Sequence, residues 1–309
     1  MFSPISEKMN RHHTLSTIRI FVTGVTSIHG WPLFRYLSEV FQPENLLGMR
    51  SPKMHQPSSV NLFSGCITDR ETLRSVRDNF KPTHIIHCAG VCDLDVCEER
   101  PHWAHQMNTV GSSLIAKVFG DTAHIIYLST DLIFSGLRTP PDGYCELSKP
   151  DPLTVAGRTI REGEEELVSG STMLTLIRLG LPIGASLTGN KGAFDFIDSR
   201  LRRSLPVTLF RDEWRSCTCF GDIADVVMKV ISDEVSGLFH CGGPVKRSLH
   251  EIGKIVLQRG GYNKSLLKGI FRIEELVGPP RMGDVSLNSN KISRLLGRDL
   301  LDPFVISSR

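Results

Sequence analysis

A hydrophobic segment that runs directly into a glycine turn constrains the fold of this chain more than any other feature. Ile18–Thr23 is rich in β-branched residues, as buried strands are, and Gly24 follows at once. Gly30 comes next, and Pro32 suits the first turn of a helix. The order strand, glycine turn, helix is typical of the first unit of a Rossmann-type fold.

The same alternation continues to about residue 180. Further strands are expected at 45–50, 60–63, 84–89, 124–129 and 173–179, and helices at 31–40, 69–76, 101–119 and 158–169. Such alternation with short connections favours a parallel sheet that helices cover on both faces. Later segments are less regular, with helices expected at 194–204, 222–232, 249–258 and near Ser289, and strands at 206–210 and 238–241.

We therefore predict an α/β protein with a Rossmann-type, doubly wound parallel sheet and a smaller C-terminal substrate lobe. The NAD(P)-binding domain is expected at 18–180, and the lobe, partly interwoven with the core, at 181–309. Residues 1–17 are polar and are expected to form a flexible extension without the apolar core of a signal peptide.

The turn between the first strand and helix has the placement of a dinucleotide-binding fingerprint. Gly24 allows a tight turn, Gly30 allows close helix–strand packing, and the helix start offers N–H groups to a pyrophosphate. Ser27 stands where a middle glycine would let the backbone approach the phosphate, so binding is expected to be weakened or lost. The alternative is an ordinary strand–turn–helix without a ligand.

The end of the second predicted strand indicates which dinucleotide fits. An acidic residue there binds the ribose hydroxyls of NAD, but this chain has Arg50. A guanidinium suits the 2′-phosphate of NADP, so NADP(H) is favoured over NAD(H). The alternative for Arg50 is an ordinary surface position.

Charge and cysteine content narrow the classes of partner. The net charge is +3, with 36 Lys and Arg against 33 Asp and Glu, too mild a balance to indicate nucleic-acid binding. The eight cysteines form no C-x-x-C pair, so no metal site is predicted, and reduced thiols in a cytoplasmic protein are expected. No apolar run has the length of a membrane span.

Several short segments, in this order, resemble dTDP-4-dehydrorhamnose reductase and its relatives, a group that includes the regulatory β subunit of methionine adenosyltransferase. The resemblance runs from about Arg19 to Pro303. The matching segments are 81–90, 95–98, Pro101, 107–111, 127–136, 151–155, 157–159, 163–164, Arg178, 222–224, 237–244 and 280–287.

The resemblance implies a set of site residues. Ser129 and Thr130 would stand where the family's hydroxyl meets the substrate carbonyl, Thr130 and Asp131 would contact substrate, and Arg215 falls near a substrate-lobe arginine. Asn108 has the alternative of a structural amide, and Asp131 that of a turn cap. The cofactor-binding residues would be Gly24, Thr26, Ser27, Ile28, His29, Gly30, Arg50, Cys88, Ala89, Gly90 and Asn108.

The same resemblance shows that the family's catalytic pair is missing. A Tyr-x-x-x-Lys on one helix face protonates the carbonyl and holds the nicotinamide ribose in the family, but Ala156 and Ile160 occupy those places here. General-acid catalysis contributes about 10²–10⁴-fold. Neither Arg161, a poor proton donor, nor the loop residue Tyr144 is an evident replacement. Cys66 marks another departure, at the place of an aspartate near the adenine.

Three functions remain open from the sequence. The first is a catalytically degenerate NAD(P)-binding protein with a regulatory or scaffold role, as a homodimer or with a regulatory protein partner. The second is an active NADPH-dependent reductase of a nucleotide sugar or another polar carbonyl compound, with Thr130 or water as proton relay. The third is a lyase or isomerase that uses the same pocket without hydride transfer. A small-molecule substrate or nucleotide is expected in each.

Overall fold

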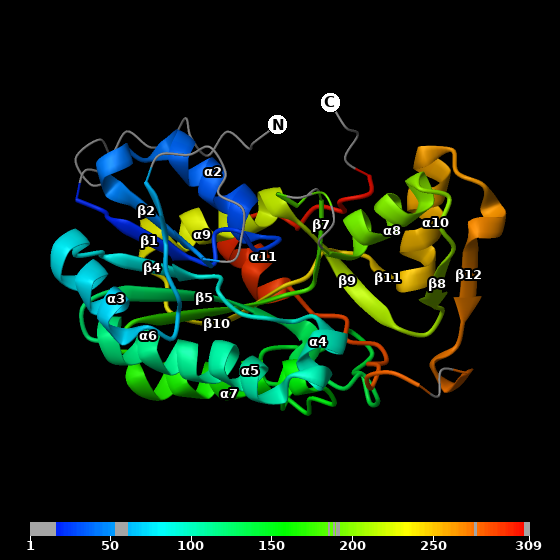
Figure 1. The fold of residues 1–309 in the computed structure, drawn as a ribbon, viewed down its shortest axis with the longest axis horizontal. Helices are drawn as coiled ribbons and strands as arrows, with labels where there is room; N and C mark the ends of the chain where they lie inside the picture. Colours follow the sequence, from blue (N-terminus) through cyan, green and yellow to red (C-terminus); the bar gives the residue numbers. More distant parts are fainter. Residues whose placement is uncertain are drawn as a thin grey trace.

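The computed structural model describes residues 17–52, 61–184, 186–187, 189, 192–274 and 277–305. Seven parallel strands form the central sheet in the order β10-β6-β5-β4-β1-β2-β3 (Figure 1). Their bounds are β1 Ile20–Thr23, β2 Leu46–Arg50, β3 Leu62–Ser64, β4 His84–His87, β5 His124–Thr130, β6 Leu174–Leu179 and β10 Gly237–Cys241. The prediction of a doubly wound parallel sheet is confirmed.

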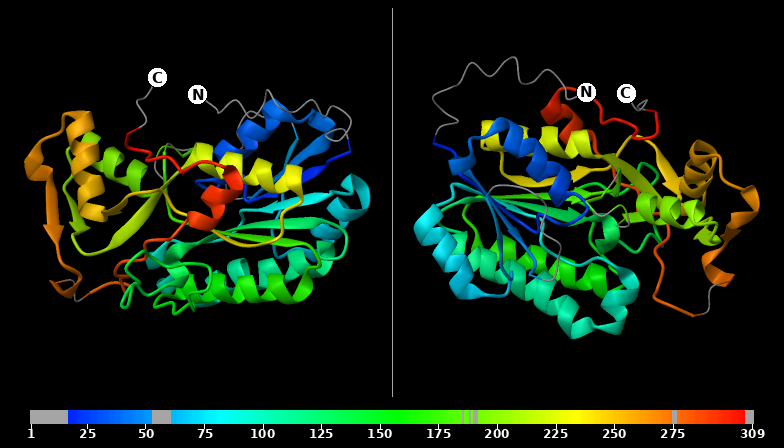
Figure 2. Two further views of the ribbon diagram at one scale, coloured as in Figure 1. Left: turned by 180° about the vertical axis from the view of Figure 1, so that it is seen from behind. Right: turned by 45° about the horizontal axis from the view of Figure 1, so that its top comes forward.

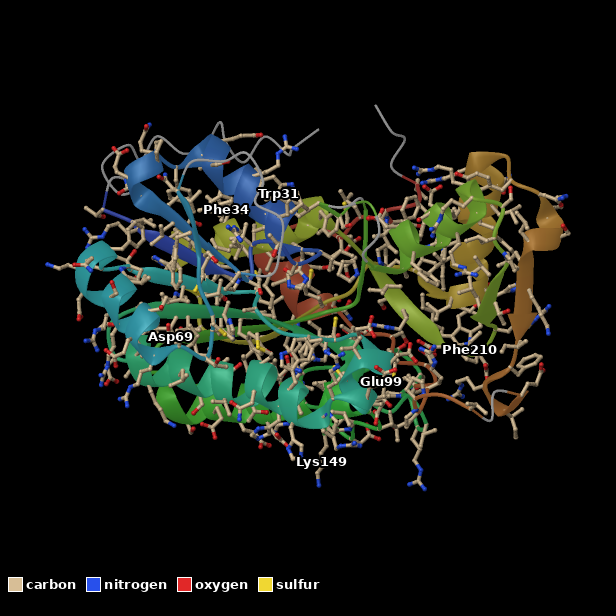
Figure 3. All side chains as sticks on the ribbon, viewed as in Figure 1. Trp31, Phe34, Asp69, Glu99, Lys149 and Phe210 are labelled. Atoms are coloured by element: carbon tan, nitrogen blue, oxygen red, sulfur yellow. The ribbon has the colours of Figure 1, made fainter. Side chains whose placement is uncertain are left out.

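Helices cover both faces of this sheet, as the continuous burial of its strands requires. One face carries α2 (Gly30–Val40), α9 (Phe220–Asp233) and α11 (Asn290–Leu296), and the other α3 (Arg70–Ser75), α5 (Pro101–His105), α6 (Gly111–Phe119) and α7 (Val155–Gly170) (Figure 1). The first α2 residues to be buried are Gly30, Leu33 and Phe34, and Figure 3 labels Phe34 beside Trp31. Each face has its own apolar core.

A smaller lobe lies beside the sheet at the end where the strands finish (Figure 2). It has its own apolar cluster, which includes Ile197, Leu209 and Ile252. Its elements are β7 Leu181–Ile183, α8 Gly192–Arg202, β8 Val207–Phe210, β9 Trp214–Cys219, β11 Lys246–Ser248, α10 Leu249–Gly260 and β12 Leu267–Ile270. β8 pairs with β12 in parallel, and β9 lies between β7 and β11.

The chain passes between the central sheet and the smaller lobe more than once. After β9 it returns through α9 and β10 to the sheet, then enters the lobe again at β11 and comes back with α11. Residues after the predicted boundary at 180 therefore contribute both to the smaller lobe and to the central sheet. The expected flexible extension at 1–17 lies, except for Thr17, outside the described residues.

Element boundaries differ from the predictions where local signals were weak. The helix expected from Arg158 begins at Val155, because Thr154 caps it by accepting from the backbone N–H of Gly157 at 3.0 Å. The third strand begins at Leu62, and residue 60 lies outside the described residues. Strand β9 was not predicted, since Glu213–Cys219 carries charged residues without alternation, yet Arg215 and Ser216 are buried.

Candidate functional site

The order of the strands reverses between β1 and β4, and ligands of such sheets bind at this switch point, beyond the carboxyl ends of the strands. The turn after β1 and the loop after β4 meet there. Gly24 has φ +64°, and a Cβ on it would lie 2.5 Å from the backbone nitrogen of Ala89. The Thr23 hydroxyl accepts from that same N–H at 3.3 Å. Glycine at residue 24 is therefore needed both for its backbone conformation and for this close approach.

The start of α2 presents polar backbone groups to this point. Among the described residues, nothing accepts a hydrogen bond from the N–H groups of Ile28 and His29. The Ser27 hydroxyl accepts from the N–H of Gly30 at 3.0 Å and so occupies one donor that a phosphate would otherwise take. The buried Nε2 of His29 has no hydrogen-bond partner in the described part of the chain, and burial lowers the pKa of His29 to about 4. Unpaired donors at a helix start suit an anionic group.

The remaining residues predicted to bind a cofactor are placed differently from one another. Gly90 is exposed beside the turn, whereas the Cys88 side chain is packed in the core, so only its backbone faces the loop. Thr26 is buried. The Arg50 guanidinium donates to the carbonyl of Ser51 at 3.2 Å. Cys66 is half-buried, and its thiol contacts the Thr68 hydroxyl at 3.1 Å.

Asn108 fastens the loop after β4 to the helices beneath it. It lies in a π-helical turn, Gln106–Val110, and its side chain pairs with both backbone groups of Val91, accepting from N–H at 2.7 Å and donating to C=O at 2.8 Å. It also donates to the Thr159 hydroxyl on α7 at 2.9 Å. Asn108 is thus buried and structurally committed, which matches the structural alternative given from the sequence.

The reaction end of the site lies at the end of β5, and its polar groups pair with one another. Ser129 donates to Glu164 at 2.6 Å, and Arg178 donates to both carboxylate oxygens of Glu164, at 3.0 and 2.7 Å. Ser129, Glu164 and Arg178 are buried. We call these three residues the buried triad. Removing one member of a buried ion pair leaves the other charge buried without compensation, which destabilises the fold.

Asp131 and Arg215 form a second buried pair, which joins the sheet to the lobe. The Arg215 guanidinium donates to both oxygens of Asp131, with Nε 2.7 Å from Oδ2. Burial opposes the charge of the guanidinium, but Asp131 and Glu213 outweigh it and hold the pKa of Arg215 above its usual value. The two predicted substrate-binding residues are therefore brought together, as partners of each other. Thr130 is half-buried and donates to Asp131 at 3.1 Å.

The two residues that the sequence analysis places at the positions of the family's Tyr and Lys lie among apolar residues. Ala156 is 0% exposed and Ile160 is 6% exposed, and both belong to the core cluster between the sheet and α7. A Cβ on Gly157 would lie 2.2 Å from the carbonyl oxygen of Leu132, so glycine is required where α7 touches the turn after β5. Neither Ala156 nor Ile160 holds a proton donor.

Tyr144 is also placed away from a donor role. Its ring stacks on Phe134 with centroids 4.1 Å apart, and its hydroxyl is buried without a partner among the described residues. Its backbone carbonyl contacts Nδ1 of His240 at 2.8 Å. The Arg161 guanidinium pairs with the exposed Glu165 at 2.8 Å and also lies 3.8 Å from the buried Glu164 carboxylate.

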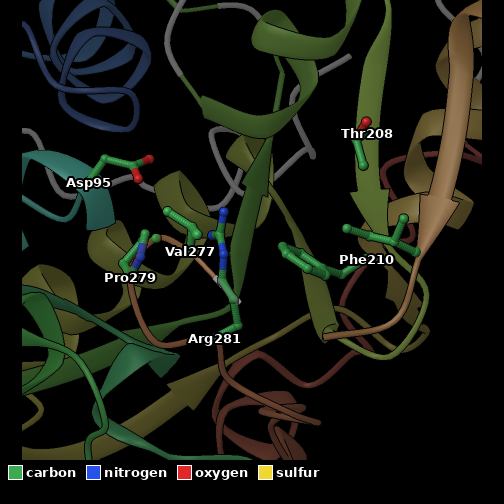
Figure 4. Close-up of a pocket in the computed structure, with 8 residues that line it drawn as sticks. Asp95, Thr208, Phe210, Val277, Pro279 and Arg281 are labelled. Atoms are coloured by element: carbon green, nitrogen blue, oxygen red, sulfur yellow. The ribbon is translucent and has the colours of Figure 1, made fainter. Parts of the chain in front are cut away.

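A pocket of about 220 Å³ opens between α4 (Leu94–Glu99) and the lobe (Figure 4). The Arg281 guanidinium lies over the Phe210 ring, 4.9 Å from its centroid, and 4.0 Å from the buried Glu213 carboxylate. Burial raises the pKa of Glu213, and Arg215 and Arg281 oppose the shift. The lining residues are Asp95, Thr208, Phe210, Ile270, Val277, Gly278, Pro279 and Arg281.

Sequence reasoning missed this pocket and the role of Glu164 and Arg178. Arg281 and Glu164 lie in segments that carried the family resemblance, which was the one available signal. Glu213 carried no signal, since an isolated acidic residue is usually solvated. Within the described part of the chain, no cluster of three potential metal ligands occurs, and no helix there is long and apolar enough to cross a bilayer.

The sheet, its switch point and the glycine turn define the class of protein as a Rossmann-type dinucleotide-binding fold. The family model of the RmlD substrate binding domain matches residues 18–301, and the chain belongs to this family. The predicted family resemblance is confirmed.

Two curated relatives illustrate the range of the family. The chain is 26% identical over 315 residues to methionine adenosyltransferase 2 subunit beta of Xenopus laevis, covering 96% of this chain and 91% of the relative. It is 27% identical over 253 residues to the probable low-salt glycan biosynthesis reductase Agl14 of Haloferax volcanii, covering 80% and 82%.

Solved structures of similar fold cover nearly the whole chain. The dTDP-4-dehydrorhamnose reductase of Bacillus anthracis, in complex with NADP, has a TM-score of 0.76 at 21% identity and covers 93% of this chain and 95% of its own. The enzyme WbmG of Bordetella bronchiseptica, in complex with NAD and UDP, has a TM-score of 0.76 at 21% identity and covers 93% and 90%. At this identity the likeness shows the fold.

Proposed function

We propose that this protein binds a nicotinamide dinucleotide and a nucleotide-linked ligand but does not carry out the family's Tyr–Lys-dependent carbonyl reduction. One observation carries the proposal: Ala156 and Ile160 are enclosed in the apolar core, while the turn at Gly24 keeps its geometry and its unpaired N–H groups. Binding and proton donation are thus separated in this chain.

The residues at the switch point fit the dinucleotide. The N–H groups of Ile28 and His29 would hold its pyrophosphate, and Arg50 would favour the 2′-phosphate of NADP over NAD. When bound, the cofactor supplies a hydride donor. Ser27 lowers the affinity, because its hydroxyl already accepts from the Gly30 N–H. The relatives whose structures hold NADP or NAD support this cofactor class.

The residues at the reaction end have structural rather than catalytic roles in this proposal. Ser129 positions Glu164 by donating to it, and Asp131 with Arg215 holds the lobe against the sheet. The pocket beside Arg281 and Phe210 would take the nucleotide-linked ligand, for which the relative solved with UDP gives support. The methionine adenosyltransferase relatives are named as subunits, so a protein partner or a homodimer is consistent with the proposal.

The second candidate is an active reductase that uses Thr130 or water as the proton relay. The observation that favours this candidate is the position of Thr130, which is half-buried and whose hydroxyl contacts the buried Asp131. That hydroxyl already donates to Asp131 and accepts from the N–H of Leu132 at 3.3 Å, which leaves the first proposal better supported.

A titration of the purified protein with NADPH and with NADH, followed by nicotinamide fluorescence, tests the cofactor claim. We expect saturable binding that is tighter for NADPH and that loses this preference in Arg50→Ala. The control Arg35→Ala, on the exposed side of α2, should keep it. The absence of binding to either dinucleotide would refute the proposal.

A further inference from the structure

Two cysteines lie on either side of the residue that begins α4. Asp93 caps this helix, and its Oδ1 accepts from the N–H of Val96 at 3.0 Å. Cys92 directly precedes Asp93, and Cys97 is the fourth residue of the helix. Side chains at these two positions characteristically pack against each other where a helix begins. We call Cys92 and Cys97 the thiol pair.

The contacts of Cys97 show the direction in which its thiol points. Its Sγ lies 3.7 Å from the backbone carbonyl oxygen of Val91, the residue before Cys92. Helical side chains lean toward the N-terminus of their helix, which brings Cys97 back toward this segment. The pKa of Cys97 is raised to about 12, mainly by burial and to a smaller extent by the neighbouring Cys92 thiol. The placement of Cys92 just before the cap and of Cys97 at the fourth helical residue brings the two side chains to the same side of the start of α4.

The backbone on both sides of the thiol pair is fixed. Asn108 holds the N–H and C=O of Val91, as described above, and the N–H of Cys97 donates to the carbonyl of Asp93 at 2.9 Å. The members of the pair differ in accessibility: Cys92 is exposed and Cys97 is buried. A reagent in solution therefore meets Cys92 first, and Cys97 is placed to react with Cys92.

We propose that the thiol pair is a site of reversible oxidation to a Cys92–Cys97 disulfide by exchange with a low-molecular-weight disulfide such as oxidised glutathione. Deprotonated Cys92 attacks one sulfur of that disulfide, and the S–S bond breaks to release the first small thiol. Deprotonated Cys97 then attacks Sγ of Cys92 and releases the second. The two protons lost by the protein are taken up by the two small thiols. The pair is oxidised and the small disulfide is reduced.

The surroundings of Cys92 set the rate and the consequence of this exchange. Cys92 is exposed as a residue, but the dense packing of protein atoms around its Sγ raises the pKa of its thiol, and the Arg215 guanidinium opposes the shift. The hydrogen bond from Ser148 lowers the pKa of Cys145, which is half-buried in another loop. We therefore expect Cys145 to react faster near neutral pH and the thiol pair to accelerate as the pH rises. Oxidation would tie the loop after β4 to α4 beside the Asp131–Arg215 pair.

The test is to incubate the reduced full-length protein with oxidised glutathione until Cys145 is fully modified. The remaining thiols are then alkylated under denaturing conditions and mapped by mass spectrometry. We expect two of the eight thiols, Cys92 and Cys97, to be lost together as a disulfide. Cys88 in the same segment should still be alkylated. Dithiothreitol should restore the thiols of Cys92 and Cys97. A Cys92 that is unreacted, or that keeps glutathione in the wild-type protein, would overturn the proposal.

Two variants separate the exchange steps. Cys97→Ala should accumulate glutathione on Cys92, because the resolving thiol is gone, and Cys92→Ser should leave Cys97 reduced. If Cys97→Ala does not fold, as judged by circular dichroism, the exposed-site variant Cys92→Ser still decides the matter: an oxidised Cys97 in that protein would contradict the assignment. Cys145→Ser is the matched control and should leave formation of the disulfide unchanged.

Discussion

The two ends of the candidate site differ in how far their polar groups are already satisfied. At the glycine turn, the N–H groups of Ile28 and His29 and the Nε2 of His29 have no partner among the described residues. At the end of β5, Ser129, Glu164 and Arg178 pair with one another, and Asp131 pairs with Arg215. An end with free donors can accept a ligand, whereas an end with paired charges mainly stabilises the fold. This difference supports the proposal that ligand binding and proton donation are separated in this chain.

The largest expected effect comes from breaking the buried triad. Glu164→Gln leaves the Arg178 guanidinium buried without its countercharge, so we expect a loss of about 3–5 kcal/mol in the free energy of unfolding. The matched control is Glu165→Gln on the next residue, whose exposed pair with Arg161 is worth at most about 1 kcal/mol. Urea unfolding of the three proteins measures the difference. Equal losses would show that the triad is not a structural element.

A smaller effect tests the close approach at the glycine turn. Gly24 and Gly261 share φ +64°, but a Cβ on Gly24 would meet the backbone of Ala89 at 2.5 Å, whereas one on Gly261 would meet nothing within 4 Å. Both alanine variants lose about 1–2 kcal/mol from the left-handed backbone. We expect Gly24→Ala to lose more stability than Gly261→Ala, as measured by thermal unfolding. Titration should show that Gly24→Ala also loses NADPH binding. If Gly261→Ala loses as much stability, the contact with Ala89 is unimportant.

The pH dependence of stability tests the connection between the turn and the helices. His87 contacts the Thr23 hydroxyl at 2.8 Å and the Ser112 hydroxyl at 3.1 Å, and burial lowers its pKa to about 3. Below pH 6.5 the unfolded chain takes up a proton on this residue and the folded chain does not. Its contribution to stability is therefore complete above pH 6.5 and falls by about 1.4 kcal/mol per pH unit below that, levelling near pH 3.

Urea midpoints between pH 7 and pH 4 measure this slope. His87→Gln should flatten it in part, since His84 and His240 also have pKa values that burial lowers, to about 4 and about 3. The exposed His102→Gln is the control and should leave the slope unchanged. A slope that persists in full in His87→Gln would show that His87 is already protonated or accessible.

The smallest effect concerns Nε2 of His29, which is buried without a hydrogen-bond partner among the described residues. Replacing this histidine with an apolar residue removes a buried polar atom that lacks a hydrogen bond, so His29→Leu is expected to gain about 1 kcal/mol of stability without ligand. Thermal unfolding with and without NADPH measures both stability and binding. The control is His105→Leu, at an exposed position of α5, which should gain nothing. A destabilised His29→Leu would mean that the imidazole makes a needed contact.

The sequence was sufficient for the sheet and insufficient for the lobe, for a physical reason. Strands such as Ile20–Thr23 are buried on both faces and appear as nearly continuous apolar runs, so they were predictable. Strand β9 is buried through Arg215 and Ser216, whose burial depends on partners distant in sequence. The site divides in the same way: the turn at 24–30 is a local pattern, but the Asp131–Arg215 pair and the pocket at Arg281 arise only from tertiary packing.

The most direct test of the central claim is a single-turnover experiment with the wild-type protein. Saturating NADPH is mixed with a nucleotide-linked 4-keto sugar, and nicotinamide absorbance is followed, with an active reductase of the family as the positive control. We predict that NADPH binds and that its absorbance does not decay. Oxidation of NADPH coupled to reduction of the sugar, abolished by Thr130→Val, would contradict this prediction and establish the chain as a reductase with a different proton donor.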